Sequence, residues 1–353
     1  MTLSPNFRNA RLVAMTLAKV GNPVRSEPLR TSKNLCRFRE EEAELLTHCF
    51  LKCFRALERH QFHHHSELGK NELFAASSAI FSDNAALLAQ GEVIARHLHA
   101  KSNHPNIKSG DLCIALIDGV TILGEPTQAL SLVKSESRVP FLQISERDGD
   151  LVLTTEQGIY PDKIDKGCLI LNHGRADGYS VYLFDKDGGN THFWVRDFLG
   201  ARPVKDDDFL TRRFSELCVA FAQRGLPEET RAEERMEVAG RAMDYLKGAE
   251  QFDSEDFAAK ALVKPERIAQ FEAFKIDYEE ESGVEIEETF SVSKKEAEKA
   301  NRRLKSRMRL DVGVELKFSP GFVHQAAHFL ERGRDEDKGM EFIKIYFYKE
   351  ENS

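Results

Sequence analysis

The chain has 353 residues, enough for one large domain or two ordinary ones. Hydrophobic residues make up 41% of it, including 24 Phe, so it can form a substantial core and is not a disordered chain. Its formal net charge of −8 argues against a protein that coats nucleic acid with its whole surface, so any DNA contact needs a local basic patch.

The first hundred residues read as one strand followed by helices. Residues 11–20 form a short apolar segment that predicts a strand, and residues 40–57 carry apolar side chains at helical spacing. Two more helices are predicted at residues 71–81 and 84–100, with Ser82 or Asp83 as the N-cap between them.

Six short β-rich runs follow between residues 111 and 184. Turn dipeptides separate some of them, namely Asp118-Gly119, Asp148-Gly149 and Asp177-Gly178. Strands at this spacing without intervening helices predict a mainly antiparallel sheet. The runs are LCIALI, ALSLV, FLQI, LVLTT, CLILN and YSVYLF.

Helical patterns return after Trp194, and strand-like runs close the chain at residues 308–318 and 340–348. Pro265 suits the first position of its helix, and Ser293 with Glu296 has the spacing of a capping box. The predicted fold class is therefore α+β: N-terminal helices, a central mainly antiparallel β-sheet, and a C-terminal helical region ending in a β element. We expect two domains, residues 1–203 and 204–353. The helices are expected at residues 207–224, 228–247, 254–262 and 265–281.

The clearest local feature is a switch of charge near the C-terminus. Residues 277–288 contain seven acidic residues and no basic one, whereas residues 294–309 contain eight basic residues and two acidic ones, a net charge of +6. We predict that these basic residues bind DNA, because Arg and Lys pair with phosphate oxygens. They are Lys294, Lys295, Lys299, Arg302, Arg303, Lys305, Arg307 and Arg309.

From Leu304 the basic residues alternate with mostly apolar ones, a pattern that places Lys305, Arg307 and Arg309 on one face of a strand. Two plainer interpretations stay open. The segment could be an ordinary solvated edge whose charges discourage aggregation. It could also form internal ion pairs with the acidic run at residues 277–288.

Catalytic, metal and cofactor motifs are not found in the sequence. The six cysteines are scattered, which favours reduced thiols, and neither a phosphate-binding glycine loop nor a GxSxG nucleophile motif occurs. The histidines at positions 60, 63, 64 and 65 are better explained as a polar loop than as a zinc site. We therefore expect no cofactor, no metal and no catalytic residue.

One enzymatic alternative remains, a Mg²⁺-dependent nuclease. Such enzymes place carboxylates and a lysine on neighbouring strands. Lys134 and Glu136 end one β run, Asp118 ends another, and Asp162 and Asp165 follow in PDKIDKG. Charged residues at strand ends usually serve solubility alone.

The N-terminal residues lack the apolar segment of a signal peptide, and no stretch approaches the roughly 18 apolar residues of a membrane span. We therefore expect a cytoplasmic protein with no membrane partner.

Several blocks in order resemble the bacterial 37-kDa nucleoid-associated protein family. They include ARHLHAKSNHPNIKSGDLCIALI, EQGIYPDKIDKGCLILN, FWVRDFLGARPVKDDDF and FKIDYEEESGVEIEETFSVSKKEAEKANRRLKSRMRLD, and they span about residues 81–347. The resemblance implies location at the nucleoid, binding to double-stranded DNA without strict sequence preference, and links to topoisomerases or other nucleoid proteins. It supplies no catalytic residue to transfer.

Three hypotheses follow. In the first, the protein is a non-enzymatic DNA-binding protein, and a homodimer would combine two modest basic patches. In the second, it is an adaptor that reaches DNA through a protein partner. In the third, it is a phosphodiester enzyme, with anti-phage defence as one setting.

Overall fold

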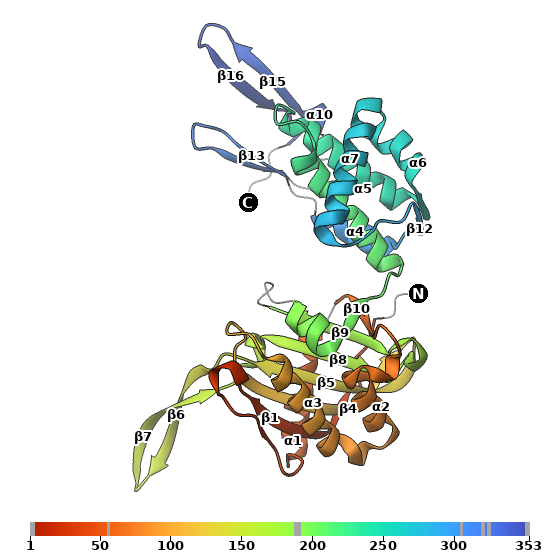
Figure 1. The fold of residues 1–353 in the computed structure, drawn as a ribbon. Coiled ribbons are helices and arrows are strands. Elements are labelled where there is room, and N and C mark those ends of the chain that lie inside the picture. Colours follow the sequence, from red (N-terminus) through yellow and green to blue (C-terminus); the bar gives the residue numbers. More distant parts are fainter. Residues whose placement is uncertain are drawn as a thin grey trace. The chain divides into compact units, whose positions relative to one another are not determined.

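The computed structural model describes residues 4–54, 57–186, 192–303, 306–318, 322 and 326–349, with the side chains of residues 232, 233, 306–309, 326 and 327 outside that description. The chain divides into two compact units, Met1–Val204 and Lys205–Ser353. Both mix helices and strands, which confirms the predicted α+β fold class (Figure 1).

The first unit is built on one eight-stranded sheet in which every neighbouring pair is antiparallel, as predicted. From edge to edge the strands are β10 (Ala201–Pro203), β3 (Arg59–Phe62), β9 (Ser180–Asp185), β8 (Lys166–Leu171), β5 (Glu125–Ser135), β4 (Gly110–Ile122), β1 (Arg11–Val20) and β2 (Arg30–Thr31).

Helices cover both faces of this sheet. Alternate residues of β4 enter different cores: Ile114 packs with α2 (Glu72–Ser82), α3 (Leu87–Lys101) and the π-helix η7 (His192–Leu199), whereas Ala115 packs with α1 (Glu40–Leu51). Because both faces are buried, the central strands read as continuous apolar runs and not as alternating ones.

Three local predictions for this unit need correction. Asp118-Gly119 is not a turn but an irregularity inside β4, where Gly119 has φ +74° and a Cβ would lie 2.2 Å from the Asn9 carbonyl oxygen. The predicted helix at residues 40–57 ends as an α-helix at Leu51, followed by the 3-10 turn η2 (Lys52–Phe54). The histidine-rich segment begins as a strand, β3, because Phe62 packs into the core.

A separate two-stranded ribbon, β6 (Val139–Arg147) and β7 (Asp150–Gly158), projects from the first unit (Figure 1). Its tip is the predicted turn Asp148-Gly149, where both residues have positive φ.

The second unit packs helices around phenylalanine. The ring of Phe214 lies 4.1 Å from that of Phe252 and 4.9 Å from that of Phe257, centroid to centroid. Its helices are α4 (Asp207–Ala220), α5 (Ala232–Gly248), α6 (Ser254–Phe257), α7 (Pro265–Ser282), α8 (Lys294–Arg303) and α10 (Ala326–Phe329), with π-helical turns η8 (Phe221–Gly225) and η9 (Ala258–Leu262).

Short strands complete the second unit. β11 (Gln251–Asp253) pairs with β12 (Thr289–Ser291), and two hairpins follow near the C-terminus. The hairpins are β13 (Ser306–Arg309) with β14 (Glu315–Phe318), and β15 (Leu330–Asp335) with β16 (Met340–Ile345). Both terminal strand-like runs of the sequence therefore contain strands.

The three most buried thiols lie in three different cores. Cys113 and Cys168 belong to the two cores of the first unit, and Cys218 belongs to the core of the second. Burial raises the pKa of Cys113 to about 12 and also raises the pKa of Cys168 and of Cys218.

Candidate nucleic-acid interface

Helix α8 carries five of the predicted DNA-binding residues, and a cap fixes where it begins. The Ser293 hydroxyl accepts a hydrogen bond from the Glu296 N–H at 3.3 Å, as the capping-box spacing predicts. The reciprocal bond differs, because the Ser293 N–H donates to Thr211 Oγ1 of α4 at 2.9 Å. The start of α8 is thereby tied to α4.

The buried side of α8 sets the direction of its basic side chains. Ala297 is buried in the core of the second unit, and Glu296 beside it is 5% exposed. Lys295, Lys299 and Arg302 follow one another at spacings of four and three residues, so they share the opposite face of the helix. Arg302 is the most exposed of these, with 81% of its side chain accessible.

Each of these cations has a weak acidic partner. Lys295 lies 3.7 Å from Asp208, Lys299 3.3 Å from Glu296, and Arg302 3.2 Å from Glu298, measured between nitrogen and oxygen. Solvent-exposed pairs of this kind contribute about 0–1 kcal/mol each, so a phosphate oxygen could replace the carboxylate at little cost.

Lys294 has a different role. Its Nζ donates hydrogen bonds to the backbone oxygens of Lys247 at 3.2 Å and Ala249 at 2.6 Å, at the C-terminal end of α5. The positive charge satisfies carbonyl groups that have no partner within the helix. Lys294 therefore joins α8 to α5.

A surface groove of about 320 Å³ runs between α4 and α8. Arg212 lines it from α4 and Arg303 from α8, and Lys299 lies between them. A second hollow shares Lys299 and Arg303 and adds Lys295 and Arg302. We call these five side chains the basic face: Arg212, Lys295, Lys299, Arg302 and Arg303.

The rest of the predicted basic segment is less fully described. Lys305 lies outside the described residues, and Arg307 and Arg309 are placed in β13 by their backbone alone. The acidic run upstream has partners of its own, since Glu288 pairs with Lys275 at 2.5 Å and Glu281 with Arg224 at 3.1 Å.

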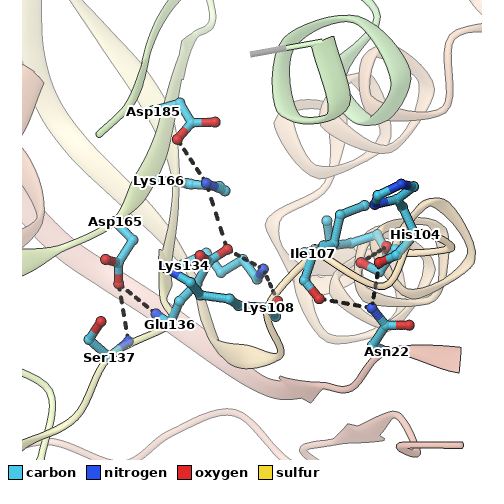
Figure 2. Close-up of polar contacts among 12 residues, drawn as sticks. Asn22, His104, Ile107, Lys108, Lys134, Glu136, Ser137, Asp165, Lys166 and Asp185 are labelled. Carbon is cyan, nitrogen blue, oxygen red and sulfur yellow. Dashed lines mark hydrogen bonds and ion pairs between the residues drawn. The ribbon is translucent and has the colours of Figure 1, made fainter. Parts of the chain in front are cut away.

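The residues of the nuclease alternative form a different arrangement, a buried ionic cluster at one end of β5 and β8 (Figure 2). Lys134 Nζ lies 2.6 Å from Glu136 Oε1 and donates to the Lys108 carbonyl oxygen at 2.7 Å. Lys166 Nζ lies 3.7 Å from the same Glu136 oxygen and 2.7 Å from Asp185 Oδ1. All four side chains are at most 3% exposed.

This cluster balances two ammonium groups against two carboxylates. Asp165, also predicted here, accepts hydrogen bonds from the backbone N–H groups of Glu136 at 2.6 Å and Ser137 at 3.2 Å (Figure 2). Burial holds the pKa of Lys134 below its usual range, against the opposing effect of Glu136. The arrangement is suited to stabilising the fold, because its charges are compensated internally and shielded from substrate.

The other two predicted carboxylates are not part of the cluster. Asp118 pairs in register with Arg11, whereas Leu112 pairs with Lys134, so about 20 Å of β4 separates Asp118 from the cluster. Asp162 lies on the 3-10 turn η5 (Pro161–Lys163) and forms an ion pair with Lys52.

A comparison with protein-family models matches residues 18–335 to the family described as nucleoid-associated protein YejK. The chain belongs to this family. The match covers most of the sequence and confirms the resemblance found in its blocks. A search of the curated proteins finds no match.

Other features of this nucleoid-associated family member bear on ligands and membranes. Among the described residues no group of three or more His, Cys, Asp or Glu side chains is arranged to hold a metal ion. The His64 and His65 rings stack at 4.2 Å, and His60 is buried in β3. No helix in the described part of the chain combines the length and the apolar character needed to cross a bilayer.

Arg212 is the residue of the basic face that the sequence did not reveal. It precedes Lys299 by more than eighty positions and stands among acidic neighbours, Asp206, Asp207, Asp208 and Glu216. Only the packing of α4 against α8 brings it to the groove.

Proposed function

We propose that this nucleoid-associated protein binds double-stranded DNA directly, through the basic face, without strict sequence preference and without catalysing a reaction. The observation that supports the proposal is the cluster of exposed cations on α8 within a protein of net charge −8. Helix α8 carries five basic and two acidic residues, so positive charge remains after its own ion pairs are counted.

Contact with phosphate explains the expected lack of sequence preference. Phosphates are the same at every base pair, and phosphate contacts position a protein without reading bases. The acidic remainder of the surface repels DNA, so binding would be confined to one side of the protein. In a homodimer, a second basic face would raise affinity through effective concentration.

The test is a salt titration of binding to long duplex DNA, comparing wild type with a variant in which Lys295, Lys299, Arg302 and Arg303 are changed to Ala. Each lost phosphate contact reduces the slope of log K against log salt by about 0.9. Loss of four contacts should therefore reduce the slope by about 3.6 and weaken binding most at low salt.

A matched control removes the same amount of charge elsewhere. Arg8, Lys33, Arg37 and Arg175 are exposed in the first unit, and changing all four to Ala alters the net charge equally. The control should bind DNA with nearly the wild-type slope. Equal weakening in both variants would mean that overall charge, and not the basic face, governs binding.

Two other outcomes would replace the proposal. If the purified wild type fails to bind duplex DNA at low salt and binds once a nucleoid protein is added, the chain is an adaptor. If Mg²⁺ produces nicks that disappear in a Glu136→Gln variant, the buried ionic cluster has a catalytic role.

A further inference from the structure

The β6–β7 ribbon is the most exposed regular structure in the first unit. Nine residue pairs join its strands, from Val139 with Gly158 at the base to Arg147 with Asp150 at the tip. At about 3.3 Å per residue the ribbon is roughly 30 Å long. Every residue from 140 to 151 is exposed, so the ribbon has little support from the rest of its unit (Figure 1).

One face of the ribbon is aliphatic. Ile144 and Leu153 are directly opposite each other across the strands, and their flanking side chains Leu142 and Leu151 lie on the same face. These four side chains are 61–73% exposed. The other face carries Gln143, Ser145, Thr154 and Glu156 together with Phe141 and Val152.

Such a ribbon needs a partner. A two-stranded hairpin alone is only marginally stable in water, and a contiguous apolar patch on a surface usually marks an interaction site. The patch is flat and aliphatic, and no groove is lined by its residues among the described pockets. A flat surface of this kind fits another flat apolar surface.

Charge identifies the class of partner. Residues 139–158 carry four acidic residues and one basic one, a net charge of −3. This charge repels DNA and anionic lipid, so the occupant is a protein. It also separates the ribbon from the basic face.

The apolar face is complementary to itself. Its β6 residues read Arg138, Pro140, Leu142, Ile144 and Glu146 at every second position, with a cation at the base and an anion near the tip. When two such faces pack antiparallel about a twofold axis through Leu142, Glu146 of each copy meets Arg138 of the other. Arg138 also pairs with Asp111 at 2.9 Å, but that surface pair is half-exposed and weak enough to exchange.

We propose that the aliphatic face of the β6–β7 ribbon binds the same face of a second copy of this chain, in antiparallel orientation, to form a twofold-symmetric dimer. The contact buries Leu142, Ile144, Leu151 and Leu153 of both copies and is bordered by two Arg138–Glu146 ion pairs. A twofold interface uses one patch on both subunits, which is the property this face has.

The first test measures the mass of the full chain by sedimentation as concentration is raised. Wild type should approach twice 40.1 kDa. A variant with Ile144→Thr and Leu153→Thr should stay monomeric over the same range. The matched control, Ser145→Thr with Val152→Thr, changes the adjacent cross-strand pair on the opposite face and should dimerise as wild type does.

The second test exchanges charge and does not depend on the stability of the apolar variant. Arg138→Glu alone and Glu146→Arg alone should each weaken the dimer, because each creates two like-charge contacts. An equimolar mixture of the two single variants should restore dimers, since opposite charges then face each other at both contacts. The double variant should also dimerise, although its pair with Asp111 stays broken.

A wild type that remains monomeric at all concentrations overturns the proposal, as does dimerisation of the Ile144→Thr, Leu153→Thr variant as tight as that of the control. Failure of the mixture to recover dimers excludes the antiparallel arrangement. The proposal is independent of DNA contact, because a monomeric ribbon variant that still binds duplex DNA leaves the basic face in place.

Discussion

Glu136 is the central residue of the buried ionic cluster. Its carboxylate faces two ammonium groups, those of Lys134 and Lys166, whereas Lys134 faces only this one carboxylate and a backbone carbonyl. Burying charges costs free energy that only well-placed partners recover. The loss of Glu136 and the loss of Lys134 therefore differ in cost.

We predict that Glu136→Gln lowers the free energy of unfolding by about 3 kcal/mol, because it leaves two buried ammonium groups with one remaining carboxylate. Lys134→Met should cost less, about 1–2 kcal/mol, since Lys166 still faces Glu136 and an ammonium group disfavoured by burial is removed. Denaturant titration of both variants, with exposed Glu156→Gln as a control, measures the difference. Equal costs for the two variants would contradict the central position of Glu136.

At the level of elements, the sequence predicted the central strands well, because long apolar runs such as those of β4 and β5 occur only where both faces of a sheet are covered. It did not predict β3, which has four residues and a polar composition and forms only by pairing with β9 and β10. Short edge-side strands depend on tertiary contacts that local patterns do not carry.

The candidate interface shows the same division. The charge pattern predicted a basic helix, and the Ser293 cap fixes its start. The use of Lys294 at the end of α5, 47 residues earlier in the chain, and the arrival of Arg212 at the groove both depend on helix packing. Side chains within one helix could therefore be predicted, and contributions from another helix could not.

The hydrogen bond between α4 and α8 gives a prediction for these elements. Thr211 is fully buried and accepts from the Ser293 N–H, so Thr211→Val keeps the shape but leaves that donor without its acceptor. We expect a loss of about 1–2 kcal/mol of unfolding free energy, measured by denaturant titration. Thr289→Val on exposed β12 is the control and should change stability little. An unchanged stability in Thr211→Val would mean that this bond does not hold α8 in place.

For the whole molecule, the division into two units follows from the composition of the cores. The core around Phe214 takes its residues from position 209 onward, and the two cores beside the sheet take theirs from positions up to 201. Since no core is shared, damage to one core should be felt first by its own unit. Each unit is expected to unfold with its own midpoint.

The placement of the thiols makes this separation measurable without adding any label to the chain. Cys168 and Cys218 are unpaired and nearly inaccessible, one in each unit, so an alkylating reagent reaches each only when its own unit opens. Pulsed alkylation along a denaturant series, read by mass spectrometry, should show that Glu136→Gln shifts modification of Cys168 alone. Thr211→Val should shift only that of Cys218, and a common shift would mean that the two units open together. The protein thus contains a natural reporter of opening in each half.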